Sequence, residues 1–305
     1  YISISSFRVD LQTGNIVIVT EMSIFEYDIN GNLINKLENT QDKTNFISFF
    51  KVNNDALLIN WTNDNPSKFQ DGLIKNAFSV LFKDGTYKNL WTSYASASSI
   101  SKGVGMAKTI VFQTDPYFFY KCGDLIRGVR SYSDTIIGID SKFNIRPEYI
   151  FTYGKYGYNK YDYSDVFNIE SDAKIITKYN PVYETSNFMF IMFQFRGLDP
   201  EPYEIEFKAP YGAVTKIKHT EVNAIFNKKS KELILLKRPE KEKIGLIDNI
   251  KNGPPFWPKS INSKNDLISY ISASDMIKHI AKVSGDVSKI KNITTNLSEE
   301  DNPVV

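Results

Sequence analysis

A short hairpin of alternating apolar and polar residues recurs along this chain of 305 residues and constrains its fold more than any other feature. It is clearest in residues 23–38, SIFEYDINGNLINKLE, where the alternation stops at Asp28, passes Gly31 and resumes at Leu33. Alternation with a period of two is typical of a half-buried strand. Glycine supplies the positive φ that a short hairpin with a bulge requires. The segment therefore predicts two antiparallel strands of a small sheet.

The same unit returns at intervals of roughly 40 to 65 residues, which is irregular but compatible with a propeller that carries insertions. We expect units over residues 1–40, 45–92, 108–154, 175–219 and 221–250, and a partial sixth unit over 255–305. About four short strands per unit is the size of one propeller blade. We therefore predict an all-β fold, a six-bladed β-propeller of four-stranded antiparallel blades in a single domain over 1–305. A β-sandwich would need far fewer strands or two domains.

One segment near the end of the chain has helical rather than strand periodicity. We predict a short helix that begins at Asp275 and is capped by Ser274. The apolar residues at helical spacing are Met276, Ile277, Ile280 and Val283. The chain starts at Tyr1 and ends as a strand begins at Val304, so we expect truncated strands at both termini of a longer protein.

Composition excludes several classes of partner and site. The 37 basic and 35 acidic residues give a net charge of +2 without a basic stripe, so no nucleic-acid partner is predicted. The single cysteine, Cys122, rules out an internal disulfide framework and is expected to be a small buried hydrophobe. No apolar run reaches the ~20 residues of a membrane span.

Two clusters suit ligand binding. Arg127, Arg130 and Tyr132 are expected in the loop before the third hairpin, where guanidinium groups could bind carboxylates, phosphates or sugar hydroxyls. A salt-bridged surface is the alternative for these arginines.

The second cluster is Phe256, Trp257 and Lys259, in a loop stiffened by prolines. Its aromatic faces could stack on a sugar or a peptide. The alternative is that Phe256 and Trp257 pack between blades. A tyrosine-rich segment could also form an adhesive rim, although a plain connector between blades is the favoured interpretation; its residues are Tyr153, Lys155, Tyr156, Tyr158, Lys160, Tyr161 and Tyr163.

Catalytic signals are weaker than binding signals in this sequence. Asp10, Asp115 and Glu184 lie near predicted inner strands and could supply the oxygen ligands that calcium or magnesium prefers, but acidic residues at strand ends are usually solvated or cap turns. The two histidines, His219 in a strand end and His279 in the helix, are too few for a zinc site of several nitrogen or sulfur ligands. A structural role is expected for Cys122.

Several segments, taken in order, resemble a known family. They are the opening YISISSFRVDLQTGNIVIV, residues 133–136 followed by 147–149, the run GPPFWPK at 253–259, residues 266–272, and the ending SEEDNPVV. In this order and spacing they resemble the Bacteroidetes six-bladed β-propeller family, which is TolB-like in fold and consists typically of envelope lipoproteins of unknown function. The resemblance spans nearly the whole chain. It implies further strand before Tyr1 and after Val305, and it offers no catalytic residues to transfer. It also implies a periplasmic or outer-membrane-anchored location in the cell envelope, with contact to a membrane only through a lipid anchor outside this chain.

Together these patterns predict a non-catalytic binding module, and the family resemblance implies that it belongs to the bacterial cell envelope. We expect a monomer without a cofactor that recognises a glycan, a peptide or an envelope protein at the mouth of the propeller. The alternative is a metal-dependent hydrolase or lyase of the lactonase-like propeller type, with a calcium or magnesium ion.

Overall fold

The computed structural model describes residues 4–10, 13–20, 23–38, 45–53, 55–63, 73–96, 98–100, 109–111, 117–157, 174–198, 203–208, 214–237, 245–262, 265–283 and 288–305. Within these ranges the chain is almost entirely antiparallel β-structure, which confirms the all-β prediction. The chain divides into two compact units, Tyr1–Ser171 and Asp172–Val305. No described helix is long and apolar enough to cross a membrane.

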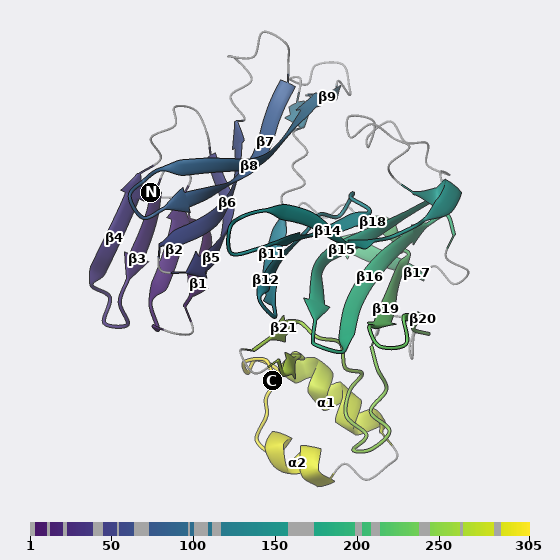
Figure 1. Cartoon of the computed structure of the whole chain (residues 1–305). Coiled ribbons are helices and arrows are strands. Elements are labelled where there is room, and N and C mark those ends of the chain that lie inside the picture. Colours follow the sequence, from purple (N-terminus) through teal and green to yellow (C-terminus); the bar gives the residue numbers. More distant parts are fainter. Residues whose placement is uncertain are drawn as a thin grey trace. The chain divides into compact units, whose positions relative to one another are not determined.

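The described residues of the first unit form three four-stranded sheets, each with its strands in chain order (Figure 1). The first sheet consists of β1 (Ile4–Val9), β2 (Ile16–Thr20), β3 (Ser23–Tyr27) and β4 (Leu33–Glu38). The second consists of β5 (Asn45–Asn53), β6 (Ala56–Asn63), β7 (Leu73–Phe82) and β8 (Tyr87–Ser96). The third consists of β11 (Phe118–Cys122), β12 (Leu125–Val129), β13 (Thr135–Ile139) and β14 (Ile145–Ile150). The unit also contains the paired strands β9 (Ser98–Ile100) and β10 (Thr109–Val111) and a 3-10 turn, Gly154–Tyr156.

The predicted hairpin is β3–β4, and its turn is built as the sequence indicates. The carboxylate of Asp28 accepts hydrogen bonds from the backbone N–H groups of Asn30 (2.9 Å) and Asn32 (2.8 Å). Gly31 has a φ of 84°, and the register shifts between Glu26 and Tyr27, as a bulge requires. The hydrogen bonds from Asn32 lower the pKa of Asp28.

The same turn closes the third sheet, so the first and third sheets share this local motif. Asp140 accepts hydrogen bonds from the backbone of Lys142 (2.8 Å) and Asn144 (2.9 Å). Phe143 occupies the position of Gly31, with a φ of 64°. The repeat therefore preserves the acceptor at the first position of the turn and tolerates a residue other than glycine at the fourth.

Apolar residues pack successive sheets of the first unit against each other. The interior between the first and second sheets contains Val17, Val19, Ile24, Phe49, Ile59, Trp61 and Leu81. The interior between the second and third sheets contains Phe50, Leu58, Phe78, Val80, Tyr117, Phe119, Ile126, Ile137 and Ile139. Strand β5 contacts both β1 and β11, so the first strands of the three sheets are neighbours. Antiparallel sheets that stack face to face in this way are the building units of propellers.

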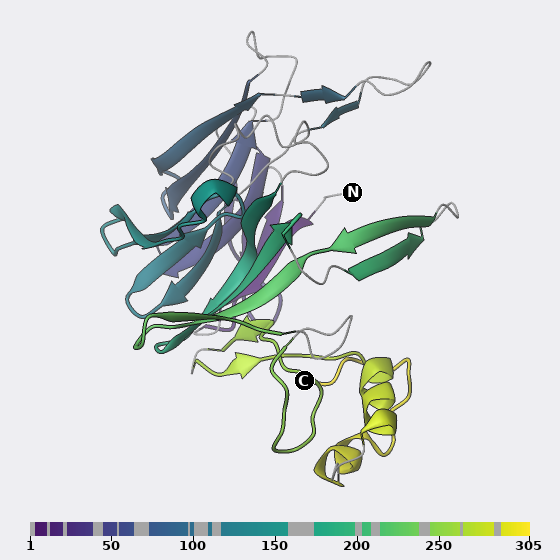
Figure 2. The same cartoon turned by 90° about the vertical axis from the view of Figure 1, so that its right-hand side faces the viewer.

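The second unit contains one further four-stranded sheet, in the order β15 (Ile175–Glu184), β16 (Phe188–Arg196), β19 (Glu221–Asn227) and β20 (Glu232–Leu235). Strand β16 is an inner strand of this sheet, and its buried residues are Met189, Phe190, Ile191 and Phe193. Two pairs of strands complete the described β-structure of this unit: β17 (Tyr203–Lys208) with β18 (Val214–His219), and β21 (Ser260–Ile261) with β22 (Leu267–Ile268). The helices α1 (Ala273–Lys282) and α2 (Ser288–Thr294) lie side by side in both views (Figure 2).

This topology corrects the predicted units over 175–219 and 221–250. Strands β17 and β18 pair with each other instead of extending the sheet of β16, and opposite charges such as Glu206 and Lys216 face each other across the hairpin. Strand β19 pairs with β16 in their place and contributes the buried Ala224. The two predicted units therefore supply one four-stranded sheet and one inserted hairpin. The third unit also begins later than predicted, because β10 pairs with β9.

The predicted helix is confirmed as α1, but its cap differs from the prediction. Ser272, not Ser274, is the N-cap: its Oγ accepts a hydrogen bond from the backbone N–H of Asp275 (3.1 Å) and donates one to the Asp275 carboxylate (2.7 Å). Helix α2 was not predicted, because residues 284–302 have a polar sequence. Val304 forms an isolated antiparallel bridge with Ile271.

Candidate functional site

Arg127 lies within β12 rather than in the predicted loop. Its side chain is buried, with 7% of the residue exposed, and its Nη1 lies 3.3 Å from the Glu148 carboxylate. Glu148 reaches Arg127 from β14 across Gly138 of β13, where an added Cβ would lie 2.5 Å from the Glu148 Cγ. The same carboxylate accepts a hydrogen bond from Arg146 at 2.7 Å. Arg127 therefore links three strands of the third sheet.

Arg130 follows β12 and lies against aromatic rings of the first unit. Its guanidinium carbon is 4.5 Å from the ring centre of Trp91 and 5.1 Å from that of Tyr117. The two rings meet edge to face at 5.2 Å. Cation–π contacts of this length stabilise a guanidinium on an aromatic surface. Tyr132, the third predicted member, is half-buried in the turn that follows. Arg127 faces Glu148, whereas Arg130 lies on Trp91 and Tyr117, so the two arginines have different partners.

The second predicted cluster occupies the second unit. Trp257 is half-buried and meets Phe190 of β16 edge to face, with ring centres 5.6 Å apart. Phe256 is half-buried too, and its backbone pairs with that of Leu246. Trp257 therefore packs on a strand of this unit, whereas Phe256 is held through its backbone.

Lys259 differs from these two residues because its ammonium group lies on an exposed ring. Its Nζ is 4.1 Å from the ring centre of Tyr270, of which 50% is exposed. Tyr183, at the end of β15, donates a hydrogen bond from its hydroxyl to the backbone carbonyl of Lys259 at 2.7 Å. The Lys259 cluster therefore comprises Lys259, Tyr270, Tyr183 and Trp257. It offers a ring, an ammonium group and a phenol to an incoming molecule.

Of the Lys259 cluster, the sequence analysis singled out Trp257 and Lys259 but not Tyr183 and Tyr270. Both tyrosines occur in or beside strand-like segments, where a tyrosine is an ordinary residue. The hydrogen bond that joins Tyr183 to Lys259 spans 76 positions of the chain, and no local pattern signals such a contact.

Burial, together with the nearby Tyr270, raises the pKa of Tyr183 from 10.0 to about 12. The neutral phenol is therefore favoured in the folded protein, and its stabilising effect is complete below the pKa of the unfolded chain. Between about pH 10 and pH 12 the folded protein binds the extra proton, so stability falls as pH rises. We expect Tyr183→Phe to make this alkaline loss shallower, as measured by urea unfolding at several pH values. An unchanged slope would show that Tyr183 titrates as it does in the unfolded chain.

The carboxylates proposed as metal ligands have lysine partners where the structure describes them. Asp10 lies 2.8 Å from the Nζ of Lys51, and Glu184, 1% exposed, lies 2.6 Å from the Nζ of Lys228. Asp115 lies outside the described residues. Within the described ranges no three His, Cys, Asp or Glu side chains are grouped so that they could hold a metal ion.

The remaining predicted residues have positions that fit structural roles. The Nε2 of His279 in α1 lies 2.9 Å from the backbone carbonyl of Asn252, which links helix and loop. His219 ends β18, as expected, but its side chain is outside the described part. Cys122 ends β11 and is half-buried rather than buried.

In the tyrosine-rich segment, burial raises the pKa of Tyr153, and Asp134 adds to the effect. Tyr156 ends the 3-10 turn. Tyr158, Lys160, Tyr161 and Tyr163 lie outside the described residues, so the choice between rim and connector stays open.

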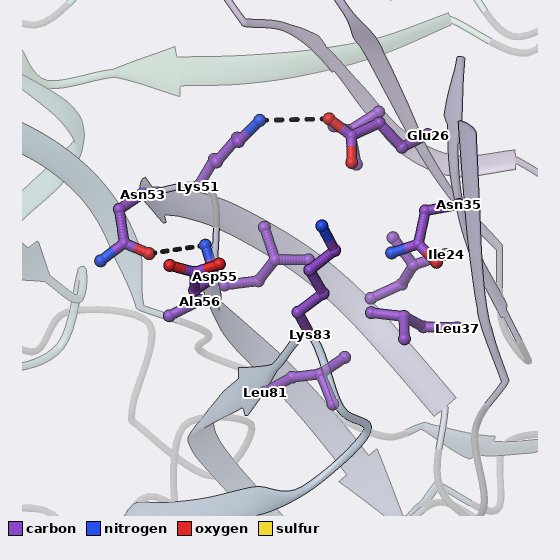
Figure 3. Close-up of a pocket in the computed structure, with 12 residues that line it drawn as sticks. Ile24, Glu26, Asn35, Leu37, Lys51, Asn53, Asp55, Ala56, Leu81 and Lys83 are labelled. Atoms are coloured by element: carbon purple, nitrogen blue, oxygen red, sulfur yellow. Dashed lines mark hydrogen bonds and ion pairs between the residues drawn. The ribbon is translucent and has the colours of Figure 1, made fainter. Parts of the chain in front are cut away.

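A pocket that the sequence did not indicate lies between the first and second sheets of the first unit (Figure 3). Its volume is about 30 Å³. Lys51 of β5 lies at its side, with its Nζ 3.2 Å from the carboxylate of Glu26. The polar groups around the pocket are Glu26, Asn35, Lys51, Asn53, Asp55 and Lys83, and the apolar ones include Ile24, Leu37 and Leu81.

Comparison of the chain with known protein families gives a match over its full length. The model of DUF4934, a domain of unknown function, matches residues 1–305. No curated protein matches the sequence.

Among solved structures, a candidate exported protein of Bacteroides fragilis is 16% identical, with a TM-score of 0.59 over 99% of this chain and 76% of that one. This similarity shows a shared fold. The WD40 domain of Pan2 from Neurospora crassa is 11% identical (TM-score 0.33, 76% of this chain, 50% of that one). Dipeptidyl peptidase 4 of Porphyromonas gingivalis is also 11% identical (TM-score 0.35, 79% of this chain, 34% of that one). These two scores are too low to support an argument.

Proposed function

Because this chain belongs to the DUF4934 family, whose function is unknown, we propose a role from its own side chains: a non-catalytic binding module that recognises a glycan through the Lys259 cluster. The observation that carries the proposal is the position of the Lys259 ammonium group, 4.1 Å from the centre of the half-exposed Tyr270 ring. An exposed aromatic ring beside a cation combines a flat apolar surface with a charged hydrogen-bond donor.

The geometry of the cluster favours a sugar among the ligands that the sequence leaves open. The C–H face of a pyranose is apolar and can pack on the exposed part of the Tyr270 ring, while ring hydroxyls or an acidic substituent accept hydrogen bonds from the Lys259 ammonium. The hydrogen bond from Tyr183 to the Lys259 carbonyl holds this segment in place before binding. A site that is already ordered loses less conformational entropy when a ligand arrives.

We further propose that the sheets of this chain are blades of one six-bladed, TolB-like propeller over residues 1–305, of Bacteroidetes type. The repeated Asp-initiated turns and the contacts of β5 with β1 and β11 support it. We also propose that the protein is a monomer in the cell envelope and has no cofactor. The fold shared with a candidate exported protein supports the envelope location.

A glycan array with the purified protein tests the function. We expect binding to one class of acidic or polyhydroxylated glycan. Lys259→Gln is expected to lower the affinity at least about tenfold, because a hydrogen bond to a charged group contributes about 1.5–3 kcal/mol. Tyr270→Ala is expected to lower it at least as much, because it removes the ring on which the sugar packs. The matched control is Lys36→Gln in the first unit, whose Nζ lies 5.8 Å from the ring centre of Phe25. It removes a similar lysine–ring contact and is expected to leave glycan binding unchanged.

Two results would count against the proposal. Equal loss of binding in Lys36→Gln and Lys259→Gln would mean that the array reports general charge. A stoichiometric divalent ion in the purified protein, with activity that EDTA removes, would favour the metal-dependent hydrolase instead.

A further inference from the structure

Strand β20 forms an open edge of the four-stranded sheet in the second unit. In the order β15–β16–β19–β20 it pairs on one side with β19, and among the described residues no strand pairs with its other side (Figure 1). Leu233, Ile234 and Leu235 are 48%, 53% and 49% exposed, so aliphatic side chains on both faces of the strand meet solvent. An exposed apolar edge of this kind is a template for pairing with another strand.

The register of β19 and β20 shows which backbone groups the open edge offers. The backbone N–H of Leu236 donates to the carbonyl of Asn223 at 2.8 Å, and these residues lie opposite each other when the register is continued. Hydrogen-bonded and non-hydrogen-bonded pairs alternate along an antiparallel ladder. Ile234 therefore bonds to β19, whereas Leu233 and Leu235 point their N–H and C=O groups away from it. The edge offers two donors and two acceptors.

The corresponding edges of the three sheets in the first unit are protected. Their last strands β4, β8 and β14 each pair with a shift in register, and β14 also contains Pro147. Bulges and prolines keep a further strand from adding to an edge. The four residues of β20 follow one another in regular register and include no proline. Strand β20 is therefore better suited than these three strands to receive an added strand.

Positive charge at both ends of β20 limits what can pair with it. Lys231 precedes the strand and Lys237 follows it, and both are exposed. If two copies of the chain paired through both outward residues of each β20, Leu233 would face Leu235 and Lys231 would face Lys237. Like charges directly opposite each other destabilise a strand pair. The edge thus disfavours a second copy and matches acidic residues at these positions.

We propose that β20 binds an extended peptide strand of a partner protein, antiparallel to itself, with three aliphatic residues at the centre and an acidic residue at each end. The strand adds to the sheet through the outward N–H and C=O groups of Leu233 and Leu235. Its aliphatic side chains pack beside those of β20, and its acidic residues lie opposite Lys231 and Lys237. Backbone hydrogen bonds supply affinity in this mode of recognition, and side chains supply specificity.

Titration of the purified protein into the labelled, capped heptapeptide Glu-Thr-Val-Val-Val-Thr-Glu, followed by fluorescence anisotropy, tests the proposal. In the antiparallel register the third and fifth residues of the peptide face Leu235 and Leu233, and its threonines face Leu236 and Glu232. We expect saturable binding. N-methylation of the third and fifth residues removes the two donors that face β20 and is expected to weaken binding about tenfold or more. N-methylation of the fourth residue is the matched control, because its N–H points away from β20. It is expected to leave binding unchanged.

Two variants of the protein and one control connect the binding to β20. Leu235→Pro removes an N–H group that has no partner among the described residues, so the protein is expected to fold and to bind the peptide about tenfold more weakly. Lys237→Glu is expected to weaken binding about threefold, and a heptapeptide with lysine as its first residue is expected to restore it. The control Lys278→Glu changes an exposed lysine of α1 and is expected to bind as the unchanged protein does.

Several results would overturn the proposal. They are absence of binding, equal weakening by N-methylation of the fourth residue, and equal binding by Leu235→Pro and Lys278→Glu. A dimer in sedimentation that Leu235→Pro dissociates would also overturn it, because a second copy would then occupy the edge. The glycan test concerns other residues, so either site can fail without the other.

Discussion

Replacement of Phe78 by alanine is expected to lower the free energy of unfolding by about 4 kcal/mol, the usual loss for truncation of a buried aromatic side chain. Phe78 of β7 is fully buried between the second and third sheets. Its ring centre lies 4.8 Å from that of Tyr117, 5.3 Å from that of Phe119 and 5.9 Å from that of Trp91. Removal of the ring leaves a cavity where these three rings meet, and rigid neighbours fill it poorly.

Urea unfolding measures this loss, and Phe25→Ala is the matched control. Phe25 of β3 is only half-buried and stacks on Tyr27 at a ring distance of 6.4 Å, so its truncation is expected to cost clearly less. Phe78→Leu is expected to fall between the two, because leucine fills part of the cavity. A loss for Phe78→Ala no larger than that for Phe25→Ala would mean that the second and third sheets do not share the interior described above.

The parts of the fold that the sequence predicts well are those that depend on neighbouring residues. The turn from Asp28 to Asn32 needs an acceptor at its first position and a positive φ at its fourth, and both requirements are visible as Asp28 and Gly31. Helix α1 likewise follows from local spacing, although the capping residue was misplaced by two positions, since both Ser272 and Ser274 could cap a helix.

The choice between strand partners is not local, and there the prediction was wrong. Strands β17 and β19 both alternate and both follow β16, so each is an acceptable partner by pattern. The cross-strand charges of β17 and β18 favour their own pairing, while β19 brings Ala224 against Ile191 of β16. Such preferences appear only when candidate pairs are compared across the chain.

For the candidate site residues, too, the sequence indicates which residue types could bind a ligand but not where they lie in the fold. The sequence identifies arginines suited to binding, but Arg127 faces Glu148 inside a sheet and Arg130 lies on Trp91. The pocket polar groups come from β3, β4, β5 and two turns, and no spacing in the sequence brings them together. The chemical character of a site residue is therefore predictable from its type. Which residues lie close together depends on how the strands pair.

Glu148→Gln is expected to lower the free energy of unfolding by about 3 kcal/mol, at the lower end of the range for breaking a buried ion pair. The substitution keeps the shape of the side chain but removes the charge that faces Arg127, and Arg127 remains buried and charged. Gly138→Ala is expected to act in the same direction, since its new Cβ would meet the Glu148 Cγ at 2.5 Å and displace the carboxylate.

Glu38→Gln is the control for this ion pair, because the contact of Glu38 with Lys36 (2.7 Å) is shorter than that of Glu148 with Arg127 (3.3 Å) but lies in an exposed position. Exposed pairs are screened by solvent and contribute little, so its effect is expected to be much smaller. Arg127→Met combined with Glu148→Met is expected to be more stable than Glu148→Gln alone, because the double variant leaves no buried charge behind. Equal losses for Glu148→Gln and Glu38→Gln in urea unfolding would show that the carboxylate across Gly138 does not hold the third sheet together.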